Sequence, residues 1–376
     1  MKNIPSSPAV KHLPLHNLHV AAGARMVEFA GWHMPVQYPA GIKQEHLHCR
    51  TQAALFDVSH MGQLRLNGKR VDRALEHLTP ADIVDLPLNQ QRYALLTSAE
   101  GGILDDCMVS RYTDYLYMVV NAARREHDIA YLKANLGEDI AVEEIHDRAL
   151  LALQGPLAAT VLARLQPEVQ HMRFMASHAI EINGAQCYVS RSGYTGEDGF
   201  EISIPIAAAT QFAEQLLVQE EVAWAGLGAR DALRLEAGLC LYGHDIDTHT
   251  TPVEAGLSWS IGKARRPGAA REGGFPGEQH ILGELVNKSA ARKRVGLVVQ
   301  GRAPVREGAA LYDQNNNRVG HVTSGLFSPT LEHPIAMAYV QTHVAKAQTY
   351  LLAEVRGKQL PVTVVSLPFV PHHYHR

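Results

Sequence analysis

The pattern of apolar and polar positions predicts many short strands, several of them in pairs, with amphipathic helices between them. Period-two alternation or short apolar runs favour strands, whereas apolar residues recurring every three or four positions favour helices. Strands are expected at Met61–Leu66, Ala94–Thr97, Leu104–Tyr112, Tyr115–Val120, Leu150–Gln154, Ala185–Ser190 and Phe200–Ile204. Helices are expected at Ile42–Ala54, Val71–His77, Arg124–Asn135, Pro156–Leu165, Ala208–Glu220 and Gly228–Gly238. Because paired strands do not alternate regularly with helices, we expect an α+β fold with antiparallel sheets.

A change in composition near residue 263 indicates a boundary. Residues 263–279 are rich in Gly, Pro and charge, which is typical of a linker, and a short helix is expected at His280–Val286. Three β-rich runs follow without a helix between them, which predicts a small antiparallel barrel: Val295–Val299, Ala310–Tyr312 and Val319–Thr323. The expected parts are a discontinuous α+β domain (1–55 and 140–265), a second α+β domain (56–139), a linker (266–289) and a C-terminal β-barrel domain (290–376).

The composition excludes several classes of protein. Of 376 residues, 46% are hydrophobic and 19% charged, as in ordinary soluble proteins. The formal net charge of −3 argues against a nucleic-acid surface. No apolar run approaches the roughly 20 residues needed to span a bilayer, so no membrane partner is expected. The N-terminus lacks a continuous apolar core and an Arg/Ser-rich amphipathic stretch, so we expect a cytoplasmic protein, or a mitochondrial-matrix protein if the source is eukaryotic.

Histidine and cysteine usage does not indicate a metal site. The 21 histidines are scattered, with denser runs only at His46–Cys49 and His372–His375. Neither HExxH nor a pair of CxxC motifs occurs, so no metal is expected. The four cysteines are far apart, and Cys107 and Cys240 lie in apolar segments, which suits a reducing compartment.

The segment Gly101–Asn121 places two adjacent carboxylates at the head of an otherwise apolar strand. Successive strand side chains point to opposite faces, so Asp105 and Asp106 cannot share one environment. An ionised carboxylate against packed surface is costly unless something binds it. The two aspartates are therefore either solvated in a turn or part of a functional site.

A second segment, Arg191–Pro205, sets acidic residues among glycines. Its strand places Phe200, Ile202 and Ile204 on one face, so Glu201 looks into solvent or into a cavity. Solvent is the default for a glutamate. Glu197 and Asp198 lie in a glycine-rich turn, and we expect both to be solvated.

A third segment, Gly226–Asp247, predicts a helix that carries two arginines. Its GLG start is not a dinucleotide fingerprint, because Asp231 stands where the third glycine belongs. Arg230 and Arg234 either pair with neighbouring carboxylates or receive an anionic ligand. The chain has no nucleophile elbow and no P-loop. Acidic and aromatic groups on an apolar scaffold suit holding an organic molecule and neutralising a cation.

Nine segments, in order along nearly the whole chain, resemble the T protein of the glycine cleavage system, a tetrahydrofolate-dependent aminomethyltransferase family. The segments are MVEFAGWHMPVQY, ALFDVSHMG, GGILDDCMV, LLALQGP, SGYTGEDGFEIS, GARDALRLEAGLCLYGHDID, TTPVEAGLSW, VTSG and FVPHHY. The resemblance implies three domains around a central folate cavity, the last a β-barrel. It also implies the reaction: the aminomethyl group on the lipoyl arm of the H protein yields ammonia, and its one-carbon unit passes to tetrahydrofolate as the 5,10-methylene form.

The resemblance also implies roles for individual residues. The second aspartate of GGILDD, Asp106, matches the family's catalytic position. Folate-binding positions of the family match Glu201, Arg230 and Tyr374. The same motifs place further residues at the cavity: Tyr194, Asn121 and Trp259. Tetrahydrofolate is expected as co-substrate and the lipoylated H protein as a transient partner.

Two alternatives from related families remain. Demethylases, and the folate domains of dimethylglycine or sarcosine dehydrogenases, act on other one-carbon donors, and the oxidising ones carry an FAD fingerprint that this chain lacks. Folate-binding proteins of iron–sulfur assembly carry K-G-C-Y-x-G-Q-E where this chain reads S-G-Y-T-G-E-D-G. Both departures favour the aminomethyltransferase.

Overall fold

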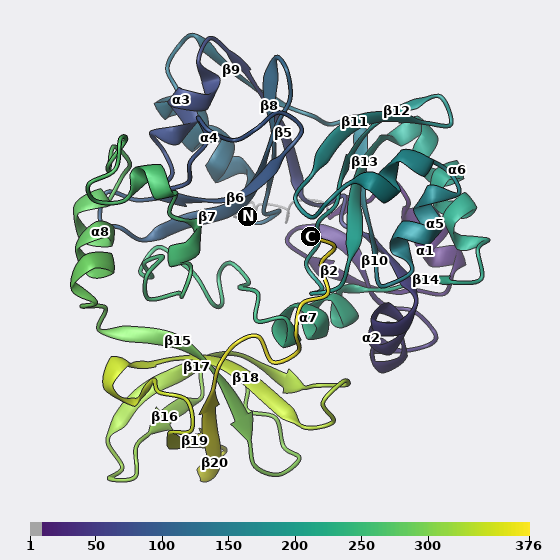
Figure 1. The fold of residues 1–376 in the computed structure, drawn as a ribbon. Coiled ribbons are helices and arrows are strands. Elements are labelled where there is room, and N and C mark those ends of the chain that lie inside the picture. The colour runs from purple at the N-terminus through teal and green to yellow at the C-terminus, as the bar shows by residue number, and fades with distance from the viewer. Residues whose placement is uncertain (1–9) are drawn as a thin grey trace, which may run out of the picture.

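The computed structural model describes residues 10–376 and shows a mixed α/β protein of three sheet systems and a small N-terminal sheet (Figure 1). The N-terminal stretch on which the expected localisation depends includes residues 1–9, which lie outside the described residues. None of the helices in the described range is long and apolar enough to cross a membrane.

The N-terminal sheet has the order β1-β3-β2, and helix α1 follows its first strand. Strand β1 runs parallel to β3, whereas β2 and β3 are antiparallel. The elements are β1 (Lys11–His12), α1 (His16–Ala21), β2 (Arg25–Phe29) and β3 (Trp32–Gln37). The sequence pattern predicted none of them, because the strands are short and only partly buried.

The second sheet has six strands in the order β11-β12-β13-β10-β4-β14. Its strands are β4 (Ala53–Asp57), β10 (Arg148–Gln154), β11 (Ser177–Ile182), β12 (Ala185–Ser190), β13 (Gly199–Pro205) and β14 (Val222–Trp224). Helices that accompany it are α2 (Ile42–Thr51), α5 (Ala158–Ala163), α6 (Ile206–Leu217), α7 (Leu227–Glu236) and the short η1 (Pro167–His171). Phe200, Ile202 and Ile204 of β13 are buried in its core, as the alternation predicts. All pairs are antiparallel except β14 with β4.

The third sheet is antiparallel throughout, with the order β6-β7-β8-β5-β9. Its elements are β5 (Gly62–Gly68), α3 (Val71–Glu76), β6 (Gln91–Thr97), β7 (Ile103–Arg111), β8 (Tyr115–Val120), α4 (Arg125–Asn135) and β9 (Ile140–Glu144). It has a hydrophobic core of its own, formed by leucine, valine and alanine side chains from the sheet and its helices. Strand β7, which carries the two aspartates, lies between β6 and β8.

The C-terminal part closes into a six-stranded barrel, confirming that prediction. Its strands are β15 (Arg292–Val299), β16 (Ala310–Tyr312), β17 (Arg318–Phe327), β18 (Pro334–Gln341), β19 (Tyr350–Val355) and β20 (Lys358–Val365). The segment before it contains η2 (Ser258–Ser260), η3 (Lys263–Arg265) and α8 (Glu278–Asn287), and η4 (Thr342–Val344) follows β18. In Figure 1 the barrel lies below the two sheet units, and α7 lies where the six-stranded sheet meets it.

Glu236, at the end of α7, joins the barrel to the rest of the protein. Its buried carboxylate accepts hydrogen bonds from Arg50 and His46 of α2, at 2.7 and 3.1 Å. It also accepts from Ser328 and Thr330, in the loop between β17 and β18. These donors lower the pKa of Glu236 to about 2 against the opposing effect of burial. A single ionised carboxylate thus connects three segments that are far apart in the sequence.

Candidate active site

The glycine pair before β7 allows another segment to pack closely against the strand. A Cβ on Gly102 would lie 1.8 Å from the carbonyl oxygen of Thr248, so only glycine fits there. The next amide, that of Ile103, donates to the carbonyl oxygens of Asp247 and Thr250, both at 3.1 Å. This contact holds the start of β7 in place and so sets the position of the two aspartates.

Asp106 is a partly exposed carboxylate held by two neutral donors. The Tyr93 hydroxyl donates to its Oδ2 at 3.0 Å, and Asn121 Nδ2 donates to its Oδ1 at 2.7 Å. Burial and the neighbouring Asp105 raise the pKa of Asp106 to about 7, while the two hydrogen bonds oppose that rise. A carboxyl with this pKa takes up or releases a proton near neutral pH, which is what a general acid or base requires.

Asp105 points to the opposite, fully buried face of the strand. It accepts hydrogen bonds from the backbone and side-chain nitrogens of Asn121, at 3.2 and 2.9 Å. Burial and the facing carboxyl of Asp128 raise the pKa of Asp105 well above its ordinary value, and burial raises that of Asp128 to about 6. Each of these two carboxyls therefore keeps a proton more readily than an exposed aspartate does. Asn121 therefore bridges the protonatable pair and Asp106.

Aromatic side chains surround Asp106. The ring of Trp259 is 63% exposed and lies 5.2 Å from that of Tyr93, centroid to centroid. Tyr194 donates its hydroxyl hydrogen to the carbonyl oxygen of Cys240. Burial raises the pKa of Tyr194, and the charge of Asp106 adds to the rise, which places the two side chains in the same electrostatic environment.

Tyr194 also connects this group to Arg230 and Glu201. The Arg230 guanidinium lies over the Tyr194 ring, 4.8 Å from its centroid. Burial raises the pKa of Glu201 and lowers that of Arg230, and the opposite charge of each partner counteracts the shift of the other. Nη1 of Arg230 is buried and has no hydrogen-bond partner among residues 10–376. A buried guanidinium N–H without an acceptor is unusual and suits an anionic or carbonyl oxygen of a ligand.

The second arginine of α7, Arg234, is paired with other side chains of the protein. Arg234 bonds Asp245 at 2.6 Å and Asp231 at 2.8 Å, and its Nη2 donates to Ser324 of the barrel. Of the two readings of this arginine pair, structural pairing thus applies to Arg234, whereas Arg230 keeps a free donor.

The described contacts of Tyr374 are with other aromatic rings. Its ring stacks on Phe174 at 4.1 Å and is tilted against His372 at 4.8 Å. No contact described for residues 10–376 joins Tyr374 to Asp106, Arg230 or Glu201. Its assignment to the folate site stays a prediction.

The expectation that Glu197 is solvated was wrong. Its side chain is 2% exposed, because Arg50 bonds it at 2.8 Å and His373 of the C-terminal tail bonds it at 2.9 Å. Asp198 is half-buried and pairs with Arg191. The glycine-rich turn is thus tied down by arginines and the tail, which the local sequence pattern did not reveal.

Three residues near the site were missed by the sequence pattern. Tyr93 comes from β6, the neighbour of β7, and Asp128 from α4, where a helical aspartate is usually solvated. His60 is buried, and its pKa falls to about 3 through burial and the charge of Arg230. The pairing of β6 with β7 and the packing of α4 bring Tyr93 and Asp128 to the site, and His60 lies in the loop between β4 and β5, so the sequence carried no local signal.

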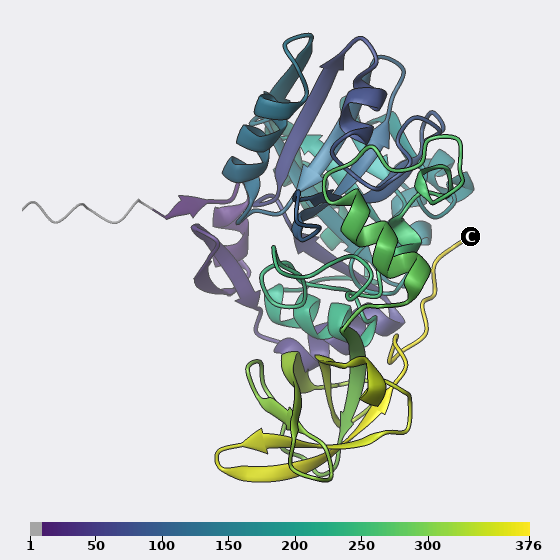
Figure 2. The same cartoon turned by 90° about the vertical axis from the view of Figure 1, so that its left-hand side faces the viewer.

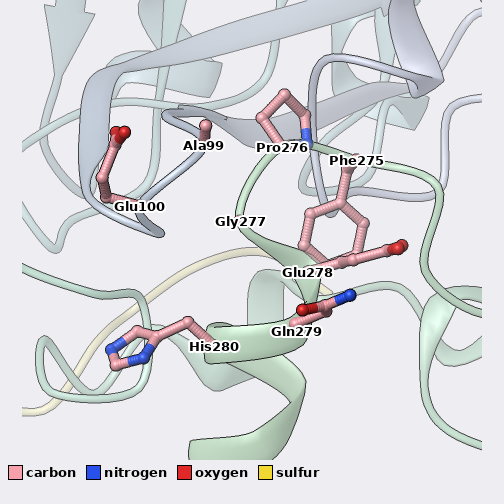
Figure 3. Close-up of a pocket in the computed structure, with 8 residues that line it drawn as sticks. All are labelled: Ala99, Glu100, Phe275, Pro276, Gly277, Glu278, Gln279 and His280. Atoms are coloured by element: carbon pink, nitrogen blue, oxygen red, sulfur yellow. The ribbon is translucent and has the colours of Figure 1, made fainter.

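One surface cavity lies away from these residues. A hollow of about 620 Å³ is lined by Ala99, Glu100 and the segment Phe275–His280 at the start of α8 (Figure 3). None of the predicted site residues lines it. Its carboxylates and the His280 ring point in different directions in Figure 3, so we assign it no ligand.

Comparison with known proteins identifies the family. The GCVT N-terminal domain family matches residues 15–265, and the glycine cleavage T-protein C-terminal barrel domain family matches residues 292–371. The human protein named mitochondrial aminomethyltransferase is 45% identical over 97% of this chain and 91% of its own length. That of Dictyostelium discoideum is 43% identical over 99% and 95%, respectively.

A solved structure agrees over its full length. The crystal structure of glycine cleavage system aminomethyltransferase T from Bartonella henselae matches with a TM-score of 0.92 and 43% identity, covering 98% of this chain and 100% of that one. That protein and the two relatives above are named as the same transferase. With both family profiles matched in order and the fold shared from end to end, this chain belongs to the glycine cleavage T-protein family of aminomethyltransferases.

Proposed function

We propose that this protein transfers the one-carbon unit of an aminomethyl group, carried on the lipoyl arm of the H protein, to tetrahydrofolate. The products are ammonia, the dihydrolipoyl H protein and 5,10-methylenetetrahydrofolate. The observation that carries the proposal is that a proton-exchanging carboxyl, Asp106, and a guanidinium with one buried nitrogen that lacks a partner, Arg230, both lie near Tyr194.

Arg230 and Glu201 are the polar groups that hold the folate in this proposal. The free Nη1 of Arg230 donates to a folate oxygen, and Glu201 accepts from the adjacent amide-like donors of the reduced pterin. Charged hydrogen bonds of this kind contribute about 1.5–3 kcal/mol each. The faces of Tyr194 and Trp259 pack the flat rings, since Tyr194 lies under Arg230 and Trp259 is largely exposed beside Tyr93, which bonds Asp106. Tyr374 is assigned to the same site on the family resemblance alone.

Asp106 acts at the one-carbon unit. The C–S and C–N bonds of the aminomethyl group break, two folate nitrogens bond to the carbon, and their two protons go to the leaving sulfur and the leaving amine. As each leaving group departs, the carbon becomes iminium-like and carries developing positive charge. The ionised carboxylate, fixed by Tyr93 and Asn121, stabilises that charge without having to reorganise. With a pKa of about 7 it also accepts the proton that the attacking nitrogen loses. Asn121 orients the carboxylate, and positioning of the two substrates contributes the remainder of the rate.

The partner follows from the reaction. The lipoylated H protein docks transiently and its arm reaches Asp106. The protein works where that partner is found, in the cytoplasm of a bacterium or the mitochondrial matrix of a eukaryote. No metal takes part in the transfer.

The deciding experiment mixes the protein with aminomethyl-loaded H protein and follows ammonia release. Release should be fast with tetrahydrofolate and slow without it, and one methylene-folate should form per ammonia. Free aminomethyl-lipoate without the H protein is the control for the partner. Release that is equally fast without folate would contradict the proposal.

A further inference from the structure

Three histidines from three separate elements face one another in the N-terminal sheet. They are His12 at the end of β1, His16 at the start of α1 and His33 in β3. One ring nitrogen from each lies within 4.8 Å of those of the other two. The ring centroids are 4.1 Å apart for His12 and His16, 5.3 Å for His16 and His33, and 5.7 Å for His12 and His33.

The local fold explains why these rings converge. Strand β1 pairs in parallel with β3, and the register sets His12 opposite His33. Leu13 and Leu15 are buried, so the turn between β1 and α1 is anchored and brings His16 back beside His12. The arrangement is therefore built from backbone pairing and core packing.

Other buried or clustered histidines already have hydrogen-bond partners within the protein. His19, one turn after His16, is buried and bonds Asp57 and Tyr38. In the two denser runs, His46 bonds Glu236 and His373 bonds Glu197. The side chains of the three facing histidines, in contrast, have no hydrogen-bond partner within residues 10–376, and Nδ1 of His16 is buried.

The three rings face one another without a hydrogen-bond partner among the described residues. Burial and the neighbouring imidazoles lower the pKa of His16. A buried ring nitrogen without a partner is costly, and three neutral imidazoles offer lone pairs to one cation. Neutral imidazole is a preferred ligand of zinc, nickel and copper.

We propose that His12, His16 and His33 form a binding site for a divalent late first-row transition metal ion, separate from the transfer site. At about 2.0–2.1 Å from zinc in a tetrahedron, ligand nitrogens stand about 3.3 Å apart. The three nitrogens, all within 4.8 Å, reach that spacing by small ring rotations. Three protein ligands leave the fourth position to water.

The bound ion has a structural effect on the N-terminal segment. Strand β1 is only two residues long, so its pairing with β3 is weak by itself. An ion held by all three elements fixes β1 and α1 against β3. Figure 2 shows this purple segment on the left of the molecule and the C-terminal tail on the right.

The test uses the full chain after removal of metals with a chelator. Titration with Zn²⁺ by calorimetry, and with Co²⁺ by visible absorption, should show one site with a nitrogen-rich spectrum and a rise in Tm. His16→Asn should weaken this binding at least 100-fold. His12→Asn, which alters an exposed residue of the set, serves as a second variant if His16→Asn fails to fold.

A matched control is His249→Asn, which changes an exposed histidine elsewhere and should leave the titration unaltered. Binding that is unchanged in both His16→Asn and His12→Asn would place the ion elsewhere, for example on the tail, and would overturn the proposal, as would the absence of binding at 50-fold excess of Zn²⁺. Ammonia release should be the same before and after metal removal. Its loss would contradict the separation of the two sites without bearing on the folate proposal.

Discussion

Replacement of Asp106 by asparagine isolates the role of the charge in the proposed transfer site. The variant keeps the size of the side chain and its oxygen still accepts a hydrogen bond from Tyr93 or Asn121. It removes the negative charge and the ability to accept a proton. Arg230, Glu201 and the aromatic side chains remain, so folate binding should change by less than about threefold.

The magnitude follows from what Asp106 does in the wild type. With a pKa of about 7, most of the carboxyl is ionised at pH 8 and its charge is fixed in place by two donors. Removing one preorganised group that stabilises transition-state charge lowers turnover about 10²–10³-fold. We expect a loss in this range at pH 8. Turnover of the wild type should rise with pH around a midpoint near 7, and the variant should lack this rise.

The same substitution should stabilise the fold. The pKa of Asp106 is raised, so the folded protein keeps this proton up to a higher pH than the unfolded chain, whose aspartate titrates near 4. Wild-type stability therefore falls as pH rises from about 4 through about 7, by at most about 4 kcal/mol. The asparagine lacks this loss but gives up one hydrogen bond, of about 1 kcal/mol. Its Tm should exceed that of the wild type at pH 8, and the difference should shrink at pH 5.

The assay combines ammonia release, folate calorimetry and thermal unfolding at several pH values. Asp114→Asn, the same change at an exposed position in the β7–β8 turn, is the matched control and should behave as wild type. Turnover of Asp106→Asn within threefold of wild type would refute the role of the charge. If turnover of the variant still rose with pH around a midpoint near 7, that midpoint would belong to a group other than Asp106.

Three further substitutions test other parts of the structure. Arg230→Ala should weaken tetrahydrofolate binding about 10- to 100-fold by calorimetry, since it removes the free buried donor, and unaltered affinity would contradict its role. Glu236→Gln should lower the free energy of unfolding by about 3 kcal/mol at pH 7 in urea titrations. That deficit should narrow as pH falls from about 4.5 towards 2, where the wild-type carboxylate, whose pKa is lowered, is itself protonated. Gly102→Ala should cost about 1–3 kcal/mol of stability because its Cβ would collide with the Thr248 carbonyl, and a Tm equal to wild type would show that the segment yields freely.

Much of the fold was predictable from local patterns. The bounds of Tyr115–Val120, Ala185–Ser190 and Ala310–Tyr312 agree with the structure, and the closed barrel and the family are confirmed. The division into domains stays a prediction. The helix expected at Ile42–Ala54 ends at Thr51, because the apolar run that follows is a buried strand. A short apolar run fits either element until its neighbours are known.

The candidate site was predictable only in part, because local patterns do not show which segments pack together. Asp106 stood out because a carboxylate in an apolar strand needs a partner. Its partner Tyr93, and Asp128, which faces Asp105, have ordinary local contexts and become relevant only when β6 and α4 pack against β7. The three facing histidines are spread over 22 positions and match no spacing motif, so their convergence depends on the parallel pairing of β1 with β3.

Helix α7 carries Arg230, the proposed folate donor, near one end and Glu236, which bonds the barrel, at the other. Arg230 and Glu236 are six residues apart, about 9 Å along one rigid rod. Displacement of the barrel therefore moves Glu236 and, through the helix, the Arg230 guanidinium. Folate bound to that guanidinium should in turn oppose displacement of the barrel. Because coupling between two sites is reciprocal, bound folate should slow protease cleavage of the loop at Ser328–Thr330. Cleavage of that loop should likewise lower the affinity for folate.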